Sequence, residues 1–348
     1  MDKIKVLVGM SGGVDSSACA VILKNQGYEV IGATMRLIPN KDDEFNKTAE
    51  EDAKKVCDIL NIEHHILDFR KEFKESVIDY FVNEYINART PNPCIACNKH
   101  LKFGLMYEAA KKMGIDFIAT GHYAKISNNN GEYELRMSSA GNKDQSYVLY
   151  NLNQELLAHT LMPLGDYTKN EIRKICEDLK LPVANKSESM EICFVEDDDY
   201  VSFIKEYANY TPVPGKIKDT SGNVLGEHQG LINYTVGQRK GIGAYGRPMF
   251  VLRLNTDTNE LILGEKGMEF SDSLIAFDVN FLSDKFIEEP IKVQAKVRYQ
   301  ASPADAVITP LEDNTVKVEF IKPQRAVTPG QAVVFYDGDK VLGGGTVL

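Results

Sequence analysis

The chain has 348 residues, 43% hydrophobic and 26% charged, a composition typical of a soluble protein with two or three domains rather than a disordered chain. Its formal net charge of −10 argues against a general nucleic-acid binder, so any basic face must be local. No apolar stretch approaches the roughly 20 residues of a membrane span and the N-terminus lacks a signal peptide's long apolar core, which predicts a cytoplasmic protein without membrane contact.

The first half of the chain alternates short apolar strands with amphipathic helices, which predicts a doubly wound α/β domain with a parallel sheet. Gly27 ends the first helix, and a capping-box spacing at Thr48 to Glu51 opens the second. The expected strands cover residues 4–9, 28–35, 63–69 and 116–122, and further helices are expected over about 16–26, 71–87 and 98–113 and before 181.

Beyond about residue 205 the chain changes to short strands separated by turn sequences such as TSGN, NTDTNE, LEDN and YDGDK. Long helical periodicity is absent after about residue 210, which indicates antiparallel β structure. We therefore expect three domains: a catalytic α/β domain over residues 1–205, a small β-containing domain over 206–271, and a C-terminal antiparallel β-barrel over 272–348.

A glycine-rich segment, SGGVDSS at residues 11–17, lies between the first expected strand and the helix that follows it. Two glycines allow a tight turn and the helix N-terminus adds unpaired N–H groups and a positive dipole, so the segment predicts an anion-binding loop. The hydroxyls of Ser11, Ser16 and Ser17 are candidate phosphate donors, and Asp15 is a candidate Mg²⁺ ligand. The alternative is a simple glycine turn capped by Asp15 or Ser16. The segment lacks the lysine of a Walker A loop and the GxGxxG dinucleotide pattern.

Further site residues are expected at the same rim, because ligands of a doubly wound sheet lie over the carboxyl ends of its strands. Met35 lies at the end of the second strand and is expected near the adenine of a nucleotide whose phosphates lie on the glycine-rich loop. In ATGHYA, Gly121 would admit the nucleotide closely and His122 would face a substrate. A histidine at a strand end is also typical of a hydrogen-bonded rim residue.

Two cysteines occur in TPNPCIACNKHLKF, residues 90–103. We expect Cys94 and Cys97 on a proline-stiffened loop before a helix that begins near Asn98, whose N-terminus would lower the pKa of a thiol. The alternative is a zinc site, but there is no second CxxC and only Cys193 and His100 would remain as ligands, so no metal site is predicted. The other cysteines occupy apolar helix positions and are expected to be buried: Cys19, Cys57 and Cys176.

Eight motifs occur in an order that points to one family: SGGVDSS, TPNPCIACNKHLKF, ATGHYA, KDQSYVL, SESMEICFV, GQRKGIG, VRY and PGQAVVFYDGDKVLGGG. The first resembles the loop of the N-type ATP pyrophosphatases. Over essentially its full length the chain resembles the bacterial tRNA-specific 2-thiouridylases. The resemblance implies an enzyme that uses ATP and Mg²⁺ to adenylate the 2-carbonyl oxygen of the wobble uridine of tRNA, then delivers sulfur from a cysteine persulfide, releasing AMP and pyrophosphate. It also implies a monomer that receives sulfur from a cysteine desulfurase or a sulfur-relay protein.

The same resemblance implies roles for individual residues. Cys97 aligns with the catalytic cysteine and Cys193 with the persulfide carrier, and the cycle would end with a disulfide between them. Many family members have aspartate where this chain has Cys94. The implied ATP-site residues are Gly9, Met10, Ser11, Gly12, Gly13, Val14, Asp15, Ser16, Met35 and Gly121. The implied tRNA contacts are Asn92, Pro93, Cys94, His122, Lys143, Asp144, Gln145, Arg298, Tyr299 and Gln331.

Three alternatives remain from the sequence. Cys94, Cys97 and Cys193 would also suit an iron–sulfur cluster with one open iron, which is not the favoured interpretation. A small-molecule ligase that adenylates a carbonyl would use the same loop, but the cysteines and the two β domains argue against it. An RNA-binding protein with an inactive loop conflicts with the intact SGGVDS sequence.

Overall fold

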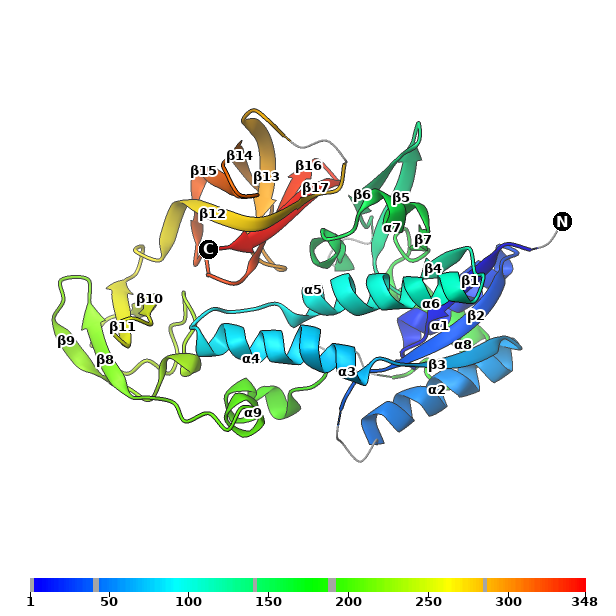
Figure 1. Cartoon of the computed structure of the whole chain (residues 1–348), viewed down its shortest axis with the longest axis horizontal. Helices are drawn as coiled ribbons and strands as arrows, with labels where there is room; N and C mark the ends of the chain where they lie inside the picture. Colours follow the sequence, from blue (N-terminus) through cyan, green and yellow to red (C-terminus); the bar gives the residue numbers. More distant parts are fainter. Residues whose placement is uncertain (1–2, 40–43, 140–142, 187–191, 284–286) are drawn as a thin grey trace.

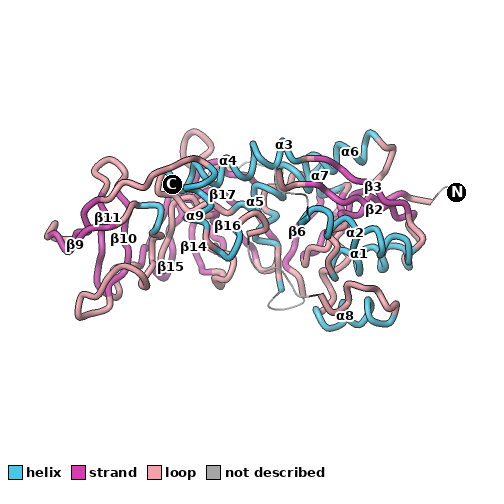
Figure 2. Tube along the Cα trace, turned by 90° about the horizontal axis from the view of Figure 1, so that it is seen from below, coloured by secondary structure: helices cyan, strands magenta, loops and turns pink. Residues whose placement is uncertain are grey.

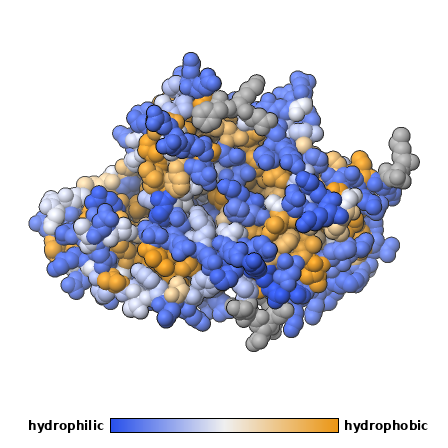
Figure 3. Space-filling view, in the orientation of Figure 1, coloured by the Kyte–Doolittle hydropathy of each residue, from blue (hydrophilic) through white to orange (hydrophobic). Residues whose placement is uncertain are grey.

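The computed structural model describes residues 3–39, 44–139, 143–186, 192–283 and 287–348. The molecule is elongated, with a parallel sheet and its helices at the end that carries the N-terminus and a small β domain at the other end (Figures 1 and 2). A β-barrel that carries the C-terminus lies between them. Hydrophilic side chains predominate on the face drawn in Figure 3. In the described ranges, no helix is both long and apolar enough to cross a membrane.

Five parallel strands form the first sheet, in the order β3-β2-β1-β4-β7. The strands are β1 (Lys5–Gly9), β2 (Glu29–Arg36), β3 (Glu63–Asp68), β4 (Phe117–Ala119) and β7 (Thr160–Leu161). The main helices packed on them are α1 (Val14–Asn25), α2 (Glu44–Leu60), α6 (Met106–Lys112) and α8 (Lys169–Asp178). Val6 and Val8 of β1 pack with α1, α2 and α8, whereas Leu7 packs with α6, so both faces of the sheet are covered. The predicted doubly wound α/β domain is confirmed.

Two long helical segments contain π-helical turns. One runs through α3 (Arg70–Phe73), η1 (Lys74–Ile78) and α4 (Asp79–Ile86), and the other through α5 (Pro93–Cys97), η2 (Asn98–Leu105) and α6. The second begins at Pro93, not near Asn98, so the prediction that Cys94 and Cys97 lie on a loop is wrong. Asn92 is the N-cap, because its side-chain oxygen accepts from the N–H groups of Cys94 and Ile95, and Pro93 occupies the first helical position.

A β-hairpin that the sequence did not predict joins the first domain to the barrel. It consists of β5 (Ala124–Asn129) and β6 (Glu132–Met137), and Arg136 of β6 pairs with Lys340 of β17 (Lys340–Val347). Ion pairs of 2.6 Å from Arg136 to Asp339 and 2.9 Å from Lys340 to Glu134 strengthen this junction. Further helices in the described ranges are α7 (Gln154–Ala158), α9 (Tyr200–Tyr207) and the 3₁₀ turns η4 (Ser146–Leu149), η5 (Glu196–Asp198) and η6 (Leu231–Asn233).

The small middle domain is a four-stranded sheet in the order β10-β11-β8-β9. Its strands are β8 (Gly215–Asp219), β9 (Val224–His228), β10 (Met249–Asn255) and β11 (Glu260–Glu265). Buried side chains such as Ile217, Val251 and Leu261 form its core. The pairs β8–β9 and β10–β11 are antiparallel hairpins, as predicted. The two hairpins join through β8 and β11, and this pair is parallel.

Six antiparallel strands form the predicted C-terminal barrel, which is confirmed. They follow the order β12-β15-β14-β13-β16-β17, and a β12–β17 pairing closes the barrel. The other bounds are β12 (Phe270–Phe281), β13 (Ile291–Lys296), β14 (Ala304–Pro310), β15 (Val316–Arg325) and β16 (Ala332–Asp337). The barrel contacts the catalytic domain just before α5, where the Thr90 N–H donates to the Pro329 carbonyl at 2.8 Å. The Tyr147 hydroxyl donates to the Ala332 carbonyl at 2.7 Å. The barrel is therefore attached beside the helix that carries Cys94 and Cys97.

Candidate active site

The predicted phosphate loop joins the end of β1 to the start of α1. Gly12 has a φ of +67°, a left-handed conformation that favours glycine, and a Cβ there would lie 2.8 Å from the carbonyl oxygen of Ala49 on α2. Gly13 is the N-cap of α1, and no side chain among the described residues caps this helix. Backbone N–H groups at the helix start are therefore available to an anion.

Serine hydroxyls hold the loop together. Ser16 Oγ accepts from the Ser11 backbone N–H at 3.2 Å and lies 3.2 Å from Ser11 Oγ. Ser17 is fully buried and donates to the Gly13 carbonyl oxygen at 2.8 Å. Ser16 Oγ also donates to the Gly13 carbonyl, at 3.2 Å, so Ser11 and Ser16 remain candidate phosphate ligands only if Ser16 gives up this longer bond. Ser17, expected as a third donor, uses its hydroxyl within the first helical turn.

Two lysines beside the loop were missed from the sequence. Lys169, the first residue of α8, lies 2.7 Å from Asp15 Oδ1, which also accepts a 2.7 Å hydrogen bond from the Tyr123 hydroxyl. Lys186 donates to the Gly12 carbonyl at 3.1 Å and to Asp52 at 2.9 Å. No local motif marks either lysine, because both reach the loop from more than 150 residues further along the chain. They place two positive charges where phosphates are expected.

The end of β4 lies directly against this loop. A Cβ on Gly121 would lie 2.8 Å from the Asp15 carbonyl carbon and 2.9 Å from the Ser16 nitrogen, so only glycine fits there. His122 is buried, its Nδ1 lies 2.8 Å from the Thr120 hydroxyl, and burial lowers its pKa well below the usual value. The Thr120 hydroxyl has no other hydrogen-bond partner within the described chain. We therefore assign this hydroxyl as the donor and the unprotonated Nδ1 of a neutral His122 ring as the acceptor. His122 then carries its own hydrogen on Nε2.

The residues beneath the loop belong largely to the protein core. Met10 is buried, its N–H donates to the Ala33 carbonyl at 2.8 Å, and its carbonyl accepts from the Thr34 hydroxyl at 2.9 Å. A Cβ on Gly9 would lie 3.3 Å from the Met106 sulfur. Met35 is partly buried against the core that contains Leu7. These residues form the floor of the site, and the adenine contact of Met35 remains a prediction.

The cysteines implied in sulfur transfer share one neighbourhood. Cys97 is buried with Phe194, which immediately follows Cys193, and burial raises the pKa of the Cys97 thiol. Cys193 is exposed as a residue, although protein atoms surround its sulfur. Burial, and then the nearby charges of Cys97 and Cys94, raise the Cys193 pKa to about 12. The expectation that the helix N-terminus lowers the pKa of Cys97 is therefore wrong, because burial raises this pKa and Cys97 lies beyond the first turn of a helix that begins at Pro93.

Lys102 is a third residue that the sequence did not reveal. Its charge lowers the pKa values of Cys97, Cys193 and His122, so it lies within electrostatic range of all three. Lys102 forms no hydrogen bond or ion pair with any described residue, and it lies in the π-helical segment η2, five residues after Cys97. π-helical turns are frequent at functional sites. A cation there would stabilise a thiolate or persulfide anion.

The cysteines differ in predicted reactivity. Near neutral pH, we expect iodoacetamide to modify Cys94 at least about tenfold faster than Cys97 or Cys193, because Cys94 is exposed and burial keeps the other two thiols protonated. Brief labelling and peptide mass spectrometry measure the order. In urea-denatured protein, the control, the three rates should converge. Labelling of Cys97 ahead of Cys94 in the native protein would contradict the prediction.

Several residues implied in tRNA contact make internal hydrogen bonds. Asp144 is buried and accepts from the Ser138 N–H at 3.0 Å and the Ser146 hydroxyl at 2.9 Å. Gln145 accepts from the Tyr123 N–H at 2.9 Å, and Gln331 donates to the Thr90 carbonyl at 3.0 Å. These bonds connect the loop after β6 and the barrel to the catalytic core. Lys143, Arg298 and Tyr299 are at least partly exposed, and tRNA contact by all of these residues remains a prediction.

In the described ranges, no group of three or more His, Cys, Asp and Glu side chains converges as the ligands of a metal ion do. The six thiols are free, and Cys19, Cys57 and Cys176 are buried as expected. An iron–sulfur cluster on the three neighbouring cysteines remains the less favoured alternative.

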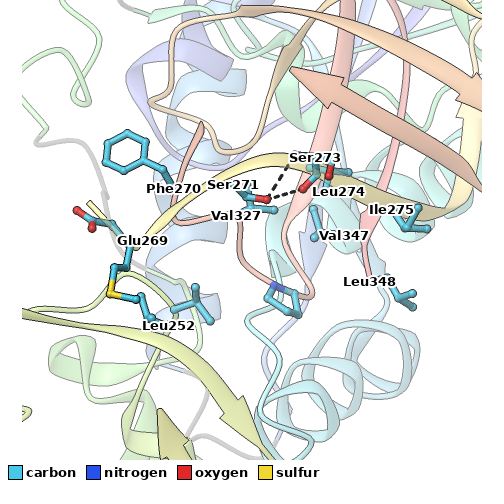
Figure 4. A pocket seen from close by; sticks show the side chains of 13 residues that line it. Leu252, Glu269, Phe270, Ser271, Ser273, Leu274, Ile275, Val327, Val347 and Leu348 are labelled. Atoms are coloured by element: carbon cyan, nitrogen blue, oxygen red, sulfur yellow. Dashed lines mark hydrogen bonds between the residues drawn. The ribbon is translucent and has the colours of Figure 1, made fainter. Parts of the chain in front are cut away.

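A cavity of about 300 Å³ opens between the middle domain and the barrel (Figure 4). It borders a bulge in β12, where the Ser271 hydroxyl donates to the Ser273 carbonyl at 2.6 Å, and its lining includes Leu252, Val327 and Leu348. None of the predicted site residues lines this cavity. The phosphate loop and the cysteines therefore remain the candidate active site.

Comparison with known proteins agrees with this architecture. Family models described as a tRNA methyl transferase HUP domain, a tRNA methyl transferase PRC-barrel domain and an aminomethyltransferase beta-barrel domain match residues 4–197, 201–265 and 271–347. The tRNA-specific 2-thiouridylase MnmA of Acetivibrio thermocellus is 52% identical, with both chains covered in full. That of Clostridioides difficile is 49% identical over 99% of this chain and 98% of its own. That of Clostridium beijerinckii is 51% identical over 99% of each chain. The chain belongs to the family of tRNA-specific 2-thiouridylases.

Proposed function

We propose that the chain is an ATP-dependent tRNA-uridine 2-sulfurtransferase, which replaces the 2-carbonyl oxygen of the wobble uridine with sulfur. One observation carries the proposal: the end of β4 connects the phosphate loop with the cysteines. Gly121 lies against Asp15 and Ser16, whereas the ring of His122 lies 5.7 Å from that of Phe103, on the helix that contains Cys97. ATP at the loop and a uridine beside Cys97 would therefore share one site. The names of the relatives support the same activity.

Adenylation would come first. The urea-like carbonyl of uracil is a poor electrophile with no leaving group, so its oxygen attacks the α-phosphorus of ATP and pyrophosphate departs. The start of α1, Lys169 and Lys186 would bind the triphosphate, and His122 Nε2–H would donate to a uracil carbonyl. The residues fit Mg²⁺, because Asp15 Oδ2 accepts no hydrogen bond within the described ranges. Bound there, Mg²⁺ would offset phosphate charge.

Sulfur transfer would follow. The outer sulfur of a persulfide on Cys193 attacks C2 of the adenylated uridine, and AMP leaves with the original oxygen. The Cys97 thiolate then attacks the Cys193 sulfur, which breaks the sulfur–sulfur bond, leaves a thiocarbonyl on the base and oxidises the two cysteines to a disulfide. A cellular dithiol reduces this disulfide, and a persulfide donor reloads Cys193. Lys102 would stabilise the anionic sulfur in both attacks.

A reconstituted reaction tests the proposal. The full-length protein is incubated with unmodified tRNA, ATP, Mg²⁺, a cysteine desulfurase with cysteine, and a dithiol. We expect 2-thiouridine in the digested tRNA and one AMP and one pyrophosphate for each thiouridine formed. Products that instead include ADP and phosphate, or AMP release that does not depend on tRNA, would contradict the proposal. The sulfur donor, the monomeric state and the cytoplasmic location remain predictions.

A further inference from the structure

Lys296, the last residue of β13, occupies an unusual position on the outside of the barrel. Its neighbours Ala295 and Val297 point into the barrel core, so Lys296 points outward. It is nevertheless only 6% exposed, because the catalytic-domain segment that contains Ser146 and Tyr147 covers this end of the strand. A lysine is rarely buried to this extent without a partner.

Three tyrosine rings surround the Lys296 ammonium. Its Nζ lies 5.8 Å from the ring centre of Tyr147, 6.0 Å from that of Tyr299 and 5.9 Å from that of Tyr336. We call these three rings the tyrosine cage. Two of them, Tyr147 and Tyr336, are fully buried, and the Tyr147 hydroxyl donates to the Ala332 carbonyl. The third ring, that of Tyr299, is 37% exposed, so the cage is open to solvent on this side. Cation–π contacts of this kind favour a charged lysine.

The ammonium lacks the acceptors that it needs. Lys296 Nζ forms no hydrogen bond or ion pair with any residue that the structure describes. Burial lowers its pKa and only the charge of Asp144 raises it, yet both carboxylate oxygens of Asp144 are already bonded to Ser138 and Ser146. The ammonium therefore has aromatic faces around it but no oxygen acceptor from the described residues, in a position that is largely shielded from water. An anion that enters beside Tyr299 would satisfy them.

We infer that Lys296 is a binding site for a backbone phosphate of the bound RNA. A phosphate supplies both the negative charge and the acceptor oxygens that the cage lacks, and the exposed ring of Tyr299 offers a surface on which an adjacent base can stack. Arg298 is exposed next to it and adds positive charge on a chain whose net charge is −10. The inference rests on the proposed function, since it requires that the chain binds RNA.

Salt-dependent RNA binding by Lys296→Met tests this inference. Fluorescently labelled, unmodified tRNA is titrated with the full-length protein at several salt concentrations. We expect Lys296→Met to weaken binding about 3- to 10-fold and to reduce the slope of log K against log salt by about 0.7 to 0.9, the loss of one phosphate contact. Lys292→Met is the matched control, because Lys292 lies on the same strand and face but is exposed, and it should leave the slope unchanged. The KM for ATP should not change in either variant, which separates an RNA phosphate from a nucleotide phosphate.

The experiment distinguishes failure of the Lys296 phosphate site from failure of the proposed function. An unchanged slope for a folded Lys296→Met protein that still thiolates tRNA overturns only the phosphate site. Absence of tRNA binding by the wild type overturns both proposals. If Lys296→Met does not fold, Lys296→Gln replaces it: this neutral polar side chain should reduce the slope by the same amount, and an unchanged slope for folded Lys296→Gln overturns the inference.

Discussion

Replacement of Cys193 by serine is expected to reduce 2-thiouridine formation to below about 1% of the wild-type rate, because a hydroxyl cannot carry the persulfide. The first-turnover burst of pyrophosphate should persist, because the phosphate loop is built from β1, α1 and α8 and does not include this cysteine. Rapid-quench measurement gives the pyrophosphate burst, and mass spectrometry of the digested tRNA from the same reaction gives the amount of 2-thiouridine.

Cys94→Ser is the matched control for this experiment. Cys94 is an exposed cysteine of the same neighbourhood, and the thiol mechanism gives it no covalent role, so this variant should still thiolate tRNA. Thiolation by Cys193→Ser would reject the persulfide mechanism. Loss of thiolation in both variants, together with iron in anaerobically purified protein, would instead favour the iron–sulfur cluster.

The strand, glycine turn and helix of the candidate phosphate loop could be predicted from the sequence, because the features that form them are local. Gly12 and Gly13 follow a strand and precede a helix, and the left-handed dihedral of Gly12 is the property for which glycine is needed. The barrel was predictable for a similar reason, since its strands are separated by recognisable turns. The β5–β6 hairpin has a turn at Asn130 and Gly131 that the same rules would have found.

The thiol site was predicted less well, for two different reasons. The start of the helix was misplaced although Asn92 and Pro93 are an N-cap and first-turn pair, a signal present in the sequence. The raised pKa of Cys97 had no such signal, because it comes from packing against aromatic residues such as Phe81 and Phe194. Lys169 and Lys186 were also unpredictable, since only the tertiary fold brings them to the loop.

Substitution of Gly12 by alanine should have the second large effect, an approximately 100-fold loss of pyrophosphate release, equivalent to about 2.7 kcal/mol of transition-state stabilisation. The new Cβ would lie 2.8 Å from the Ala49 carbonyl and 3.1 Å from Asp52 Cβ, and the φ of +67° adds strain. Because the first contact is with backbone of α2, the loop itself must shift. That shift would move the Gly12 carbonyl away from Lys186 and misalign the N–H groups that are proposed to bind the phosphates.

Gly114→Ala separates the effect of the loop from the effect of backbone strain. Gly114 has nearly the same φ, +66°, but no atom lies within 4 Å of the position of its Cβ. This control should therefore lose about 1 kcal/mol of unfolding free energy through the left-handed conformation alone and keep its activity. Urea unfolding and a pyrophosphate assay on both variants give the comparison. Equal losses of activity in Gly12→Ala and Gly114→Ala would show that general destabilisation, not displacement of the phosphate loop, lowers adenylation.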